Sequence, residues 1–279
     1  MSVVDDHCAQ LVRTADRDLF LATLFAPEPA RQHIFALYAF SCEVAQVRDR
    51  VSEPMPGEIR LQWWRDQLES GVTSGHPVAD AVIEALKSHD LPSAPLVALT
   101  HARIFDLYND PMPSATDFEG YCGETVSVLF QLGAVMLNGG ADPGTSEAAG
   151  HAGVAYGIME ALRSLPRHAS RHQFFLPADR LAALGGRVDD VFAGIATDAL
   201  NRLADEMIVL ARDHLIKARA ALSGTPDTVM PAFLPMALVA PTLDRLAAPG
   251  RNALEPFSPH AQWRRQFMLW HASRKALPF

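Results

Sequence analysis

Apolar residues recur at helical spacing over a long stretch near residues 195–222, and this pattern constrains the fold most. Leucine, methionine and alanine return there every few residues, at Leu200, Leu203, Met207, Leu210, Leu215 and Ala218. Such spacing places the side chains on one face of a helix. Alternation with a period of two and hairpin turn signals are weak in the rest of the chain. We therefore predict an all-α protein.

Proline and glycine residues divide the remaining chain into further helical segments. We predict helices over 3–25, 28–50, 58–70, 77–89, 94–108, 118–137, 145–165, 178–184, 233–246 and 259–276. Ser114 or Thr116 should cap the helix that contains 118–137, because a hydroxyl oxygen there can accept from an unpaired backbone N–H. Pro166 should end or kink its helix. These segments predict a single-domain helical bundle over residues 1–279.

Charge and cysteine usage exclude several classes of protein. The chain carries 24 Lys and Arg against 32 Asp and Glu, a net charge of −8, which argues against a nucleic-acid partner. Cys8, Cys42 and Cys122 form neither a metal pattern nor a disulfide framework, as expected in a reducing compartment. The chain contains no run of about 18 uninterrupted apolar residues, so we predict no membrane span. Acidic residues near the start disfavour a targeting peptide, so we expect a cytoplasmic protein.

The stretch from Ala36 to Asp49 reads A-L-Y-A-F-S-C-E-V-A-Q-V-R-D. It resembles the first signature of the squalene/phytoene synthase family, A-L-Y-A-F-C-R followed by D-D-x-x-D. Ala45 and Gln46 stand where that pattern has its first two aspartates. Only Asp49 is retained, so the first metal-binding motif is degenerate.

A second stretch, from Tyr156 to Pro177, resembles the family pattern Q-L-T-N-I-L-R-D-V-x-E-D that ends in G-R-x-Y-L-P. Ser164 replaces the first aspartate of that motif, and Arg167 and His168 replace its Glu-Asp pair. Weaker similarities, including Arg60-Leu-Gln-Trp-Trp64 and Arg212-Asp-His214, extend the resemblance over nearly the whole chain.

The resemblance implies an isoprenoid-synthase-like helical bundle with a central cavity. Enzymes of the family join two prenyl diphosphates head to head to make squalene or phytoene, and Mg²⁺ holds the diphosphates. Mg²⁺ prefers carboxylate oxygens, and these are mostly missing from both motifs. We therefore expect no metal or cofactor, with Asp49 as the one residual metal candidate. The alternative for Asp49 is an ion pair with a neighbouring arginine, Arg48 or Arg50.

The second motif has become basic, which leaves two interpretations open. Arg163, Arg167 and Arg171, together with Tyr38, are candidates for a metal-free site that binds an anion or another ligand. Otherwise the basic side chains form a solvated surface. Glu160, four residues before Ser164, could face the same pocket.

The tryptophans also allow two interpretations. Trp63, Trp64, Trp263 and Trp270 are most simply core aromatics, although their rings also suit a membrane interface.

The runs A-Q-V-R-D at residues 45–49 and L-R-S-L-P-R-H-A-S-R-H-Q-F-F-L-P at 162–177 resemble one branch of the family. That branch contains the non-catalytic mitochondrial complex I assembly factor and its bacterial relatives. The resemblance implies a pseudoenzyme that assists assembly of respiratory complex I by binding a partner subunit or an isoprenoid-like ligand. Peripheral contact with the inner membrane face, on the matrix side in an organelle, is compatible with this role. The alternative is an active prenyltransferase, which would need Mg²⁺, and a peripheral lipid-binding protein without a role in complex I is a third interpretation.

Overall fold

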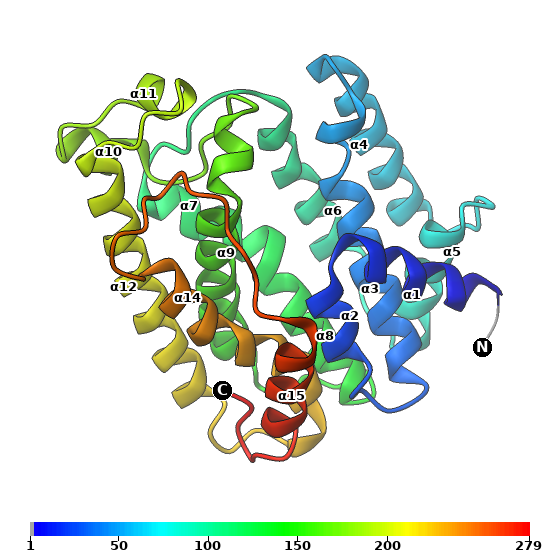
Figure 1. Ribbon diagram of the computed structural model, residues 1–279. Helices are drawn as coiled ribbons and strands as arrows, with labels where there is room; N and C mark the ends of the chain where they lie inside the picture. Colours follow the sequence, from blue (N-terminus) through cyan, green and yellow to red (C-terminus); the bar gives the residue numbers. More distant parts are fainter. Residues whose placement is uncertain (1–2) are drawn as a thin grey trace.

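The computed structural model describes residues 3–279, and over this range every regular element is a helix (Figure 1). The α-helices are α1 Val3–Ala15, α2 Arg17–Thr23, α3 Ala30–Ala45, α4 Pro54–Ser70, α5 Pro77–Ser88, α6 Ala94–Ala102, α7 Ala115–Cys122, α8 Val128–Leu137, α9 Ser146–Ala169, α10 Ala178–Ala183, α11 Val188–Phe192, α12 Asp198–Ala221, α13 Met230–Phe233, α14 Val239–Leu246 and α15 Gln262–Ala272. Shorter elements are the 3₁₀ turns η1 Arg48–Arg50, η2 Arg103–Leu107, η4 Asp227–Val229 and η5 Leu234–Leu238, and the π-helical turn η3 Gly123–Ser127. The prediction of an all-α fold is confirmed.

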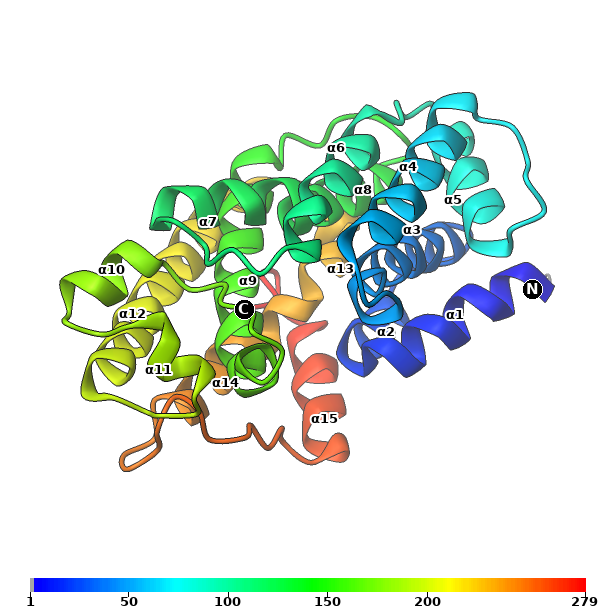
Figure 2. The ribbon, with the colours of Figure 1, turned by 90° about the horizontal axis from the view of Figure 1, so that it is seen from above.

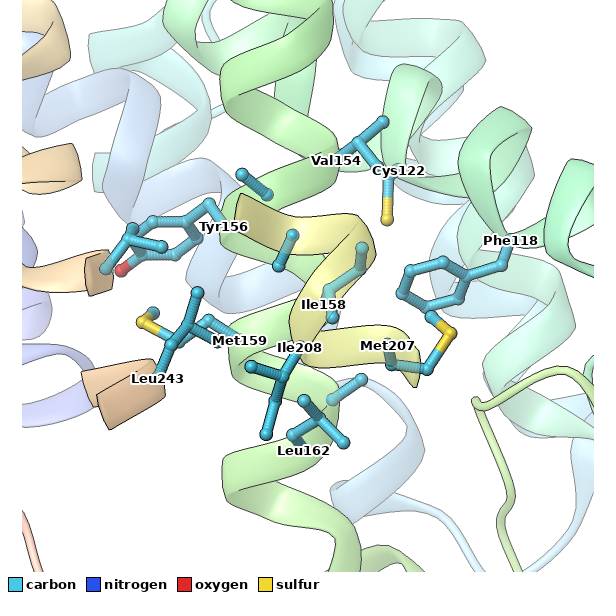
Figure 3. Close-up of a cluster of buried hydrophobic side chains, with 14 of the residues drawn as sticks. Phe118, Cys122, Val154, Tyr156, Ile158, Met159, Leu162, Met207, Ile208 and Leu243 are labelled. Carbon is cyan, nitrogen blue, oxygen red and sulfur yellow. The ribbon is translucent and has the colours of Figure 1, made fainter. Parts of the chain in front are cut away.

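Two long helices, α9 and α12, lie side by side and carry the largest core cluster. Figure 3 shows Ile158 and Met159 of α9 near Met207 and Ile208 of α12, with Phe118 of α7 beside them. The apolar face that the sequence predicts for α12 is thus the face that packs on α9. This pair fixes the position of the second motif.

A second core cluster holds the N-terminal half together. Helix α3 packs against α1 and α5, and its Leu37 and Phe40 are fully buried. In both ribbon views α1, α3, α4 and α5 lie on one side of the molecule, while α9, α10, α12 and α14 lie on the other (Figures 1 and 2). The first motif therefore comes from one half of the molecule and the second from the other.

Two predicted helix ends are wrong in the N-terminal half. The segment predicted as one helix over 3–25 breaks at Asp16, whose extended backbone and side chain cap α2 by accepting from the backbone N–H groups of Asp18 and Leu19. The segment predicted over 28–50 leaves the α-helix at Ala45 and continues through η1. After Ala45 the backbone N–H groups of Val47, Asp49 and Arg50 donate to carbonyls three residues back rather than four, which tightens the chain into the 3₁₀ turn. Asp49 consequently does not lie on α3.

Pro166 was predicted to end or kink its helix, and the first of these two outcomes is wrong. Helix α9 continues to Ala169, and the backbone N–H of Ser170 donates to the Pro166 carbonyl at 3.2 Å. A proline removes one helical hydrogen bond, and here buried Leu165 and Ala169 hold the last turn against the core. Arg167 and His168 thus remain on a helix.

Two further predicted helices are interrupted: after Phe233 the segment over 233–246 is the 3₁₀ turn η5 until α14 begins at Val239, and the segment over 118–137 contains the π-helical turn η3. The remaining boundaries lie closer to those predicted. Ser114 caps α7 as expected, because its hydroxyl oxygen accepts from the backbone N–H of Asp117. The predicted helix over 94–108 tightens into η2 after Ala102, and α11 was not predicted. Trp64 is buried, but the simplest interpretation of Trp63, Trp263 and Trp270 as core aromatics is wrong, since all three are exposed.

Two helical stretches, Ala115–Leu137 and Asp227–Leu246, are long and apolar enough to cross a membrane by length and composition alone. More than half of each stretch is buried inside the molecule, as in the core helices of many folded proteins. This finding is weak evidence for a span.

Candidate functional site

A cavity of about 350 Å³ opens between the end of α3, the turn η2, helix α7 with η3, and helix α9. Both degenerate motifs face it, through Ala45, Gln46 and Asp49 on one side and Ser164, Arg167, His168 and Arg171 on the other. A larger hollow of about 870 Å³ is lined by residues between 241 and 268 and contains none of these positions. The smaller cavity is therefore the candidate site.

Close packing of α9 on η3 positions one wall of the cavity. A β-carbon added at Gly153 would lie 2.1 Å from Ser127 Oγ, and one at Gly157 would lie 2.4 Å from Cys122 Sγ. Glycine at these positions permits the contact. The π-helical turn places Thr125 and Val126 on the cavity lining.

Asp49 pairs with Arg171 rather than with a neighbouring arginine. The Arg171 guanidinium donates to the Asp49 carboxylate, which joins η1 to the residues that follow α9. Arg50 instead pairs with Glu43 at 2.7 Å, and Arg48 donates to the Val51 carbonyl at 3.3 Å. Asp49 is therefore ion-paired, as one of the two interpretations predicted, but its partner is Arg171 rather than the neighbouring Arg48 or Arg50.

The side chains at the two motifs do not fit a Mg²⁺ clamp. Ala45, Gln46 and Ser164 offer no carboxylate, and the carboxylate of Asp49 already accepts from Arg171. Mg²⁺ needs several oxygen ligands in octahedral geometry. Within residues 3–279, no group of three or more His, Cys, Asp or Glu side chains has an arrangement that could hold a metal ion.

Three more carboxylates line the cavity, and each already has a partner. Asp16 caps α2, Asp106 belongs to a buried ionic network, and Glu160 accepts from Arg163. Any metal bound by this set would have to compete with those contacts.

The buried network consists of Arg103, Asp106 and Tyr121. Arg103 donates to Asp106 Oδ2 at 3.1 Å and to the Tyr121 hydroxyl at 2.7 Å, and that hydroxyl donates to Asp106 Oδ1 at 2.6 Å. Gln173 reaches the same place, because its Nε2 donates to the Asp106 carbonyl at 3.0 Å. Burial raises the pKa of Asp106, and the adjacent Arg103 opposes that rise. A closed loop of hydrogen bonds of this kind fixes a buried ion pair in one geometry.

Sequence reasoning missed Arg103 and Asp106. The available signal was an opposite-charge pair three residues apart in the otherwise apolar segment that precedes Tyr108. Both side chains face the cavity.

Glu160 faces the cavity, as the sequence suggested. Burial raises the pKa of the Glu160 carboxyl to about 7, although Arg163 lies 2.6 Å away and opposes the shift. Arg163 in turn approaches Asp18 at 3.8 Å, and Asp18 also accepts from Arg265 of α15. The second motif is thus connected to α2 and α15 through charged side chains.

The basic residues of the second motif lie in two different environments, one partly buried and one exposed. Burial, together with Arg167 and Arg171, lowers the pKa of His168 to about 4, so this imidazole is neutral near pH 7. Its ring packs on Phe175 at a centroid distance of 4.8 Å. Arg167 is exposed at the cavity mouth, and no carboxylate of the described chain lies within ion-pair distance of it.

Unpaired polar atoms concentrate around this cavity. Six buried side-chain nitrogen or oxygen atoms lack a hydrogen-bond partner in the described part of the chain. Four of them belong to residues that line the cavity, namely Arg48 Nε, Arg103 Nε, Glu160 Oε1 and His168 Nδ1. Buried polar atoms nearly always have a partner, so this concentration is typical of a site that takes polar groups or water.

Two of the predicted ligand-binding residues lie outside the lining. Tyr38 is buried in the core cluster of the N-terminal half, and burial raises the pKa of its hydroxyl. Arg163 lies next to the cavity, where it pairs with Glu160 and Asp18. Arg167 and Arg171 remain the basic candidates that reach the cavity.

Residues 12–267 match the model of the squalene/phytoene synthase family. The chain is 31% identical over 281 residues to NADH dehydrogenase (ubiquinone) complex I assembly factor 6 from Rattus norvegicus, which covers 95% of this chain and 84% of the relative. It is 25% identical over 236 residues to a 15-cis-phytoene synthase from Synechococcus elongatus, which covers 80% of this chain and 76% of that enzyme. A solved dehydrosqualene synthase superposes with a TM-score of 0.83 at 15% identity over 96% of this chain and 94% of the other, so it shares the fold.

Proposed function

The chain belongs to the squalene/phytoene synthase family, and from this premise we propose that it is a member without prenyltransferase activity that assists assembly of respiratory complex I. One observation carries the proposal. Of the motif positions that meet at the cavity, Ala45, Gln46, Ser164, Arg167 and His168 carry no carboxylate, and the remaining one, Asp49, is paired with Arg171. Relatives named as complex I assembly factors match nearly the whole chain, which supports the same role.

Deletion of the gene in the source organism tests this role. Complex I content, measured on native gels, and NADH–quinone oxidoreductase activity should both fall, while succinate oxidation should be unchanged. The wild-type gene should restore both. Normal complex I level and activity in the deletion strain would contradict the proposal.

The cavity supplies the means of action. We propose that it binds an isoprenoid-like ligand or a segment of a complex I subunit or assembly protein, because its apolar walls are combined with unpaired polar atoms. The proposal needs no metal, since Arg167, which has no carboxylate partner among the described residues, supplies positive charge at the cavity. Calorimetry with farnesyl diphosphate in EDTA should show binding that Arg167→Gln weakens. A cross-linking experiment on intact membranes would identify a protein segment if the ligand does not bind.

A second candidate function is head-to-head prenyl transfer. The presence of Asp16, Asp106 and Glu160 on the cavity lining favours it, since these are the carboxylates that a relocated Mg²⁺ site would have to use. Incubation of the pure protein with farnesyl and geranylgeranyl diphosphate plus Mg²⁺, followed by mass spectrometry of extracted hydrocarbons, decides between the two. Squalene or phytoene above the level in an Asp106→Asn control would overturn the non-catalytic proposal.

We also propose that the protein is cytoplasmic and peripheral on the inner membrane face, or on the matrix side of that membrane in an organelle. Cell fractionation with a tagged chain tests this location.

A further inference from the structure

Helix α15 is attached to the molecule along one side only. Its Leu269 and Ala272 are buried in a small cluster with Leu21 of α2 and with Leu234 and Leu238 of η5. The ion pair between Arg265 and Asp18 adds a second attachment to α2. Both ribbon views show α15 at the edge of the molecule beside α2 (Figures 1 and 2). The orientation of the helix is therefore fixed.

The opposite side of α15 presents three large aromatic side chains to solvent. Trp263, Phe267 and Trp270 are 70%, 58% and 43% exposed, and their spacing of four and three residues places them on one helical face. The rings of Phe267 and Trp270 lie 5.8 Å apart. Phe25 is also partly exposed and lines a hollow together with the end of α15, which extends the apolar surface. Exposed aromatic surface of this extent usually marks an interaction site.

The chain segment that carries these rings has only positive charges, and the carboxylates beside it come from other elements: Asp18 pairs with Arg265, and Asp227 lines the hollow that Arg274 and Lys275 share. Residues 256–279 contain no aspartate or glutamate and carry Arg264, Arg265, Arg274 and Lys275, although the whole chain has a net charge of −8. Arg265 is engaged by Asp18, while Arg264, Arg274 and Lys275 are exposed. The Arg274 guanidinium lies over the Trp270 ring, 4.0 Å from its centroid.

We propose that the outer face of α15 docks on the surface of an anionic phospholipid bilayer. Trp263, Phe267 and Trp270 enter the interfacial layer, where amphipathic rings are favoured, and Arg264, Arg274 and Lys275 contact lipid phosphates. A protein partner could also use tryptophan and arginine, but a run of 24 residues without a carboxylate matches a surface of one charge sign. The proposal is independent of complex I assembly, because pure protein and lipid are sufficient to test it.

Flotation of the purified chain with vesicles tests the surface directly. The protein should float with vesicles rich in phosphatidylglycerol, float poorly with pure phosphatidylcholine, and dissociate as salt is added. The triple variant Trp263→Ser, Phe267→Ser, Trp270→Ser should lose binding to both kinds of vesicle. The variant Arg264→Gln, Arg274→Gln, Lys275→Gln should lose the preference for anionic lipid, by about fivefold for each cation removed.

A matched control removes exposed apolar side chains elsewhere. Ile59→Ser, Val209→Ser and Ile216→Ser change residues that are 65%, 67% and 69% exposed, and this variant should bind as the wild type does. Circular dichroism should show that all variants retain their helical content. The proposal is overturned if the wild-type chain does not bind anionic vesicles, or if the aromatic triple variant binds them equally well. Loss of a copurifying protein in that variant, without any vesicle binding by the wild type, would assign the surface to a protein partner instead.

Discussion

Replacing Glu160 by glutamine should remove a pH dependence of stability that the buried carboxyl imposes. Its pKa rises from an ordinary 4.5 to about 7, mainly because burial disfavours the carboxylate. The folded state therefore holds the proton more tightly than the unfolded state does. Below about pH 4.5 the carboxyl is protonated in both states, so Glu160 does not lower the free energy of unfolding. As pH rises from there through the folded pKa, the unfolded state releases the proton first, and the free energy of unfolding falls.

The size of this effect follows from the shift. Each pKa unit corresponds to about 1.4 kcal/mol, so the full cost approaches about 3 kcal/mol above pH 7. Between about pH 5 and about pH 8 the free energy of unfolding of the wild type should fall by about 2–3 kcal/mol relative to that of Glu160→Gln. All other titrating groups are common to both proteins and cancel to first order.

Urea denaturation of both proteins across this pH range measures the difference. Glu147→Gln serves as the control, because Glu147 lies near the start of the same helix and is exposed. The Glu147 variant should follow the wild-type profile. If the free energies of unfolding of the Glu160 variant and the wild type change in parallel with pH, burial does not raise the pKa of the Glu160 carboxyl.

Three further changes test other parts of the structure. Gly157→Ala should destabilise the protein by about 1–3 kcal/mol, because the new methyl group would meet the Cys122 sulfur at 2.4 Å. In the double variant with Cys122→Ala, part of this cost should be recovered, whereas strictly additive urea-denaturation energies would contradict the contact. Ser114→Ala should lower the free energy of unfolding by about 1 kcal/mol through loss of the α7 cap, and an unchanged urea midpoint would speak against that cap. Asp106→Ala should cost about 3–5 kcal/mol, because it leaves the Arg103 guanidinium buried without its carboxylate, and a change below about 1 kcal/mol would contradict burial of the pair.

The sequence predicted the helical elements well where periodicity and caps act locally. The apolar face of α12 and the Ser114 cap both follow from residues within a few positions of each other. The helix ends at Asp16 and Ala45 depend instead on local hydrogen bonds, the Asp16 cap on α2 and the 3₁₀ backbone bonds after Ala45. These compete with a continued α-helix, and that competition is hard to weigh from sequence. Pro166 is the opposite case, because packing of the last helical turn against the core keeps the helix intact although proline removes a local hydrogen bond.

Prediction of the site depended on what each residue contacts. The two motifs could be located from sequence because their order and spacing resemble those of a known family. The Asp49–Arg171 pair joins residues 122 positions apart, and the Arg103–Tyr121 contact also crosses between helices. Neither contact leaves a periodic trace in the sequence, so three-dimensional coordinates are needed to find it.

The changes at the two motifs are physically connected. Several carboxylates facing one cavity repel each other unless a cation lies between them. Where Ala45, Gln46 and Ser164 remove most of those carboxylates, a divalent ion is no longer needed to balance the charge. The one motif carboxylate that remains, on Asp49, is neutralised by Arg171, which bridges the two motifs directly. An internal guanidinium thus links the two motifs at the place where the family pattern has metal-binding aspartates, and on the proposed function the unpaired polar atoms of the cavity would select its ligand.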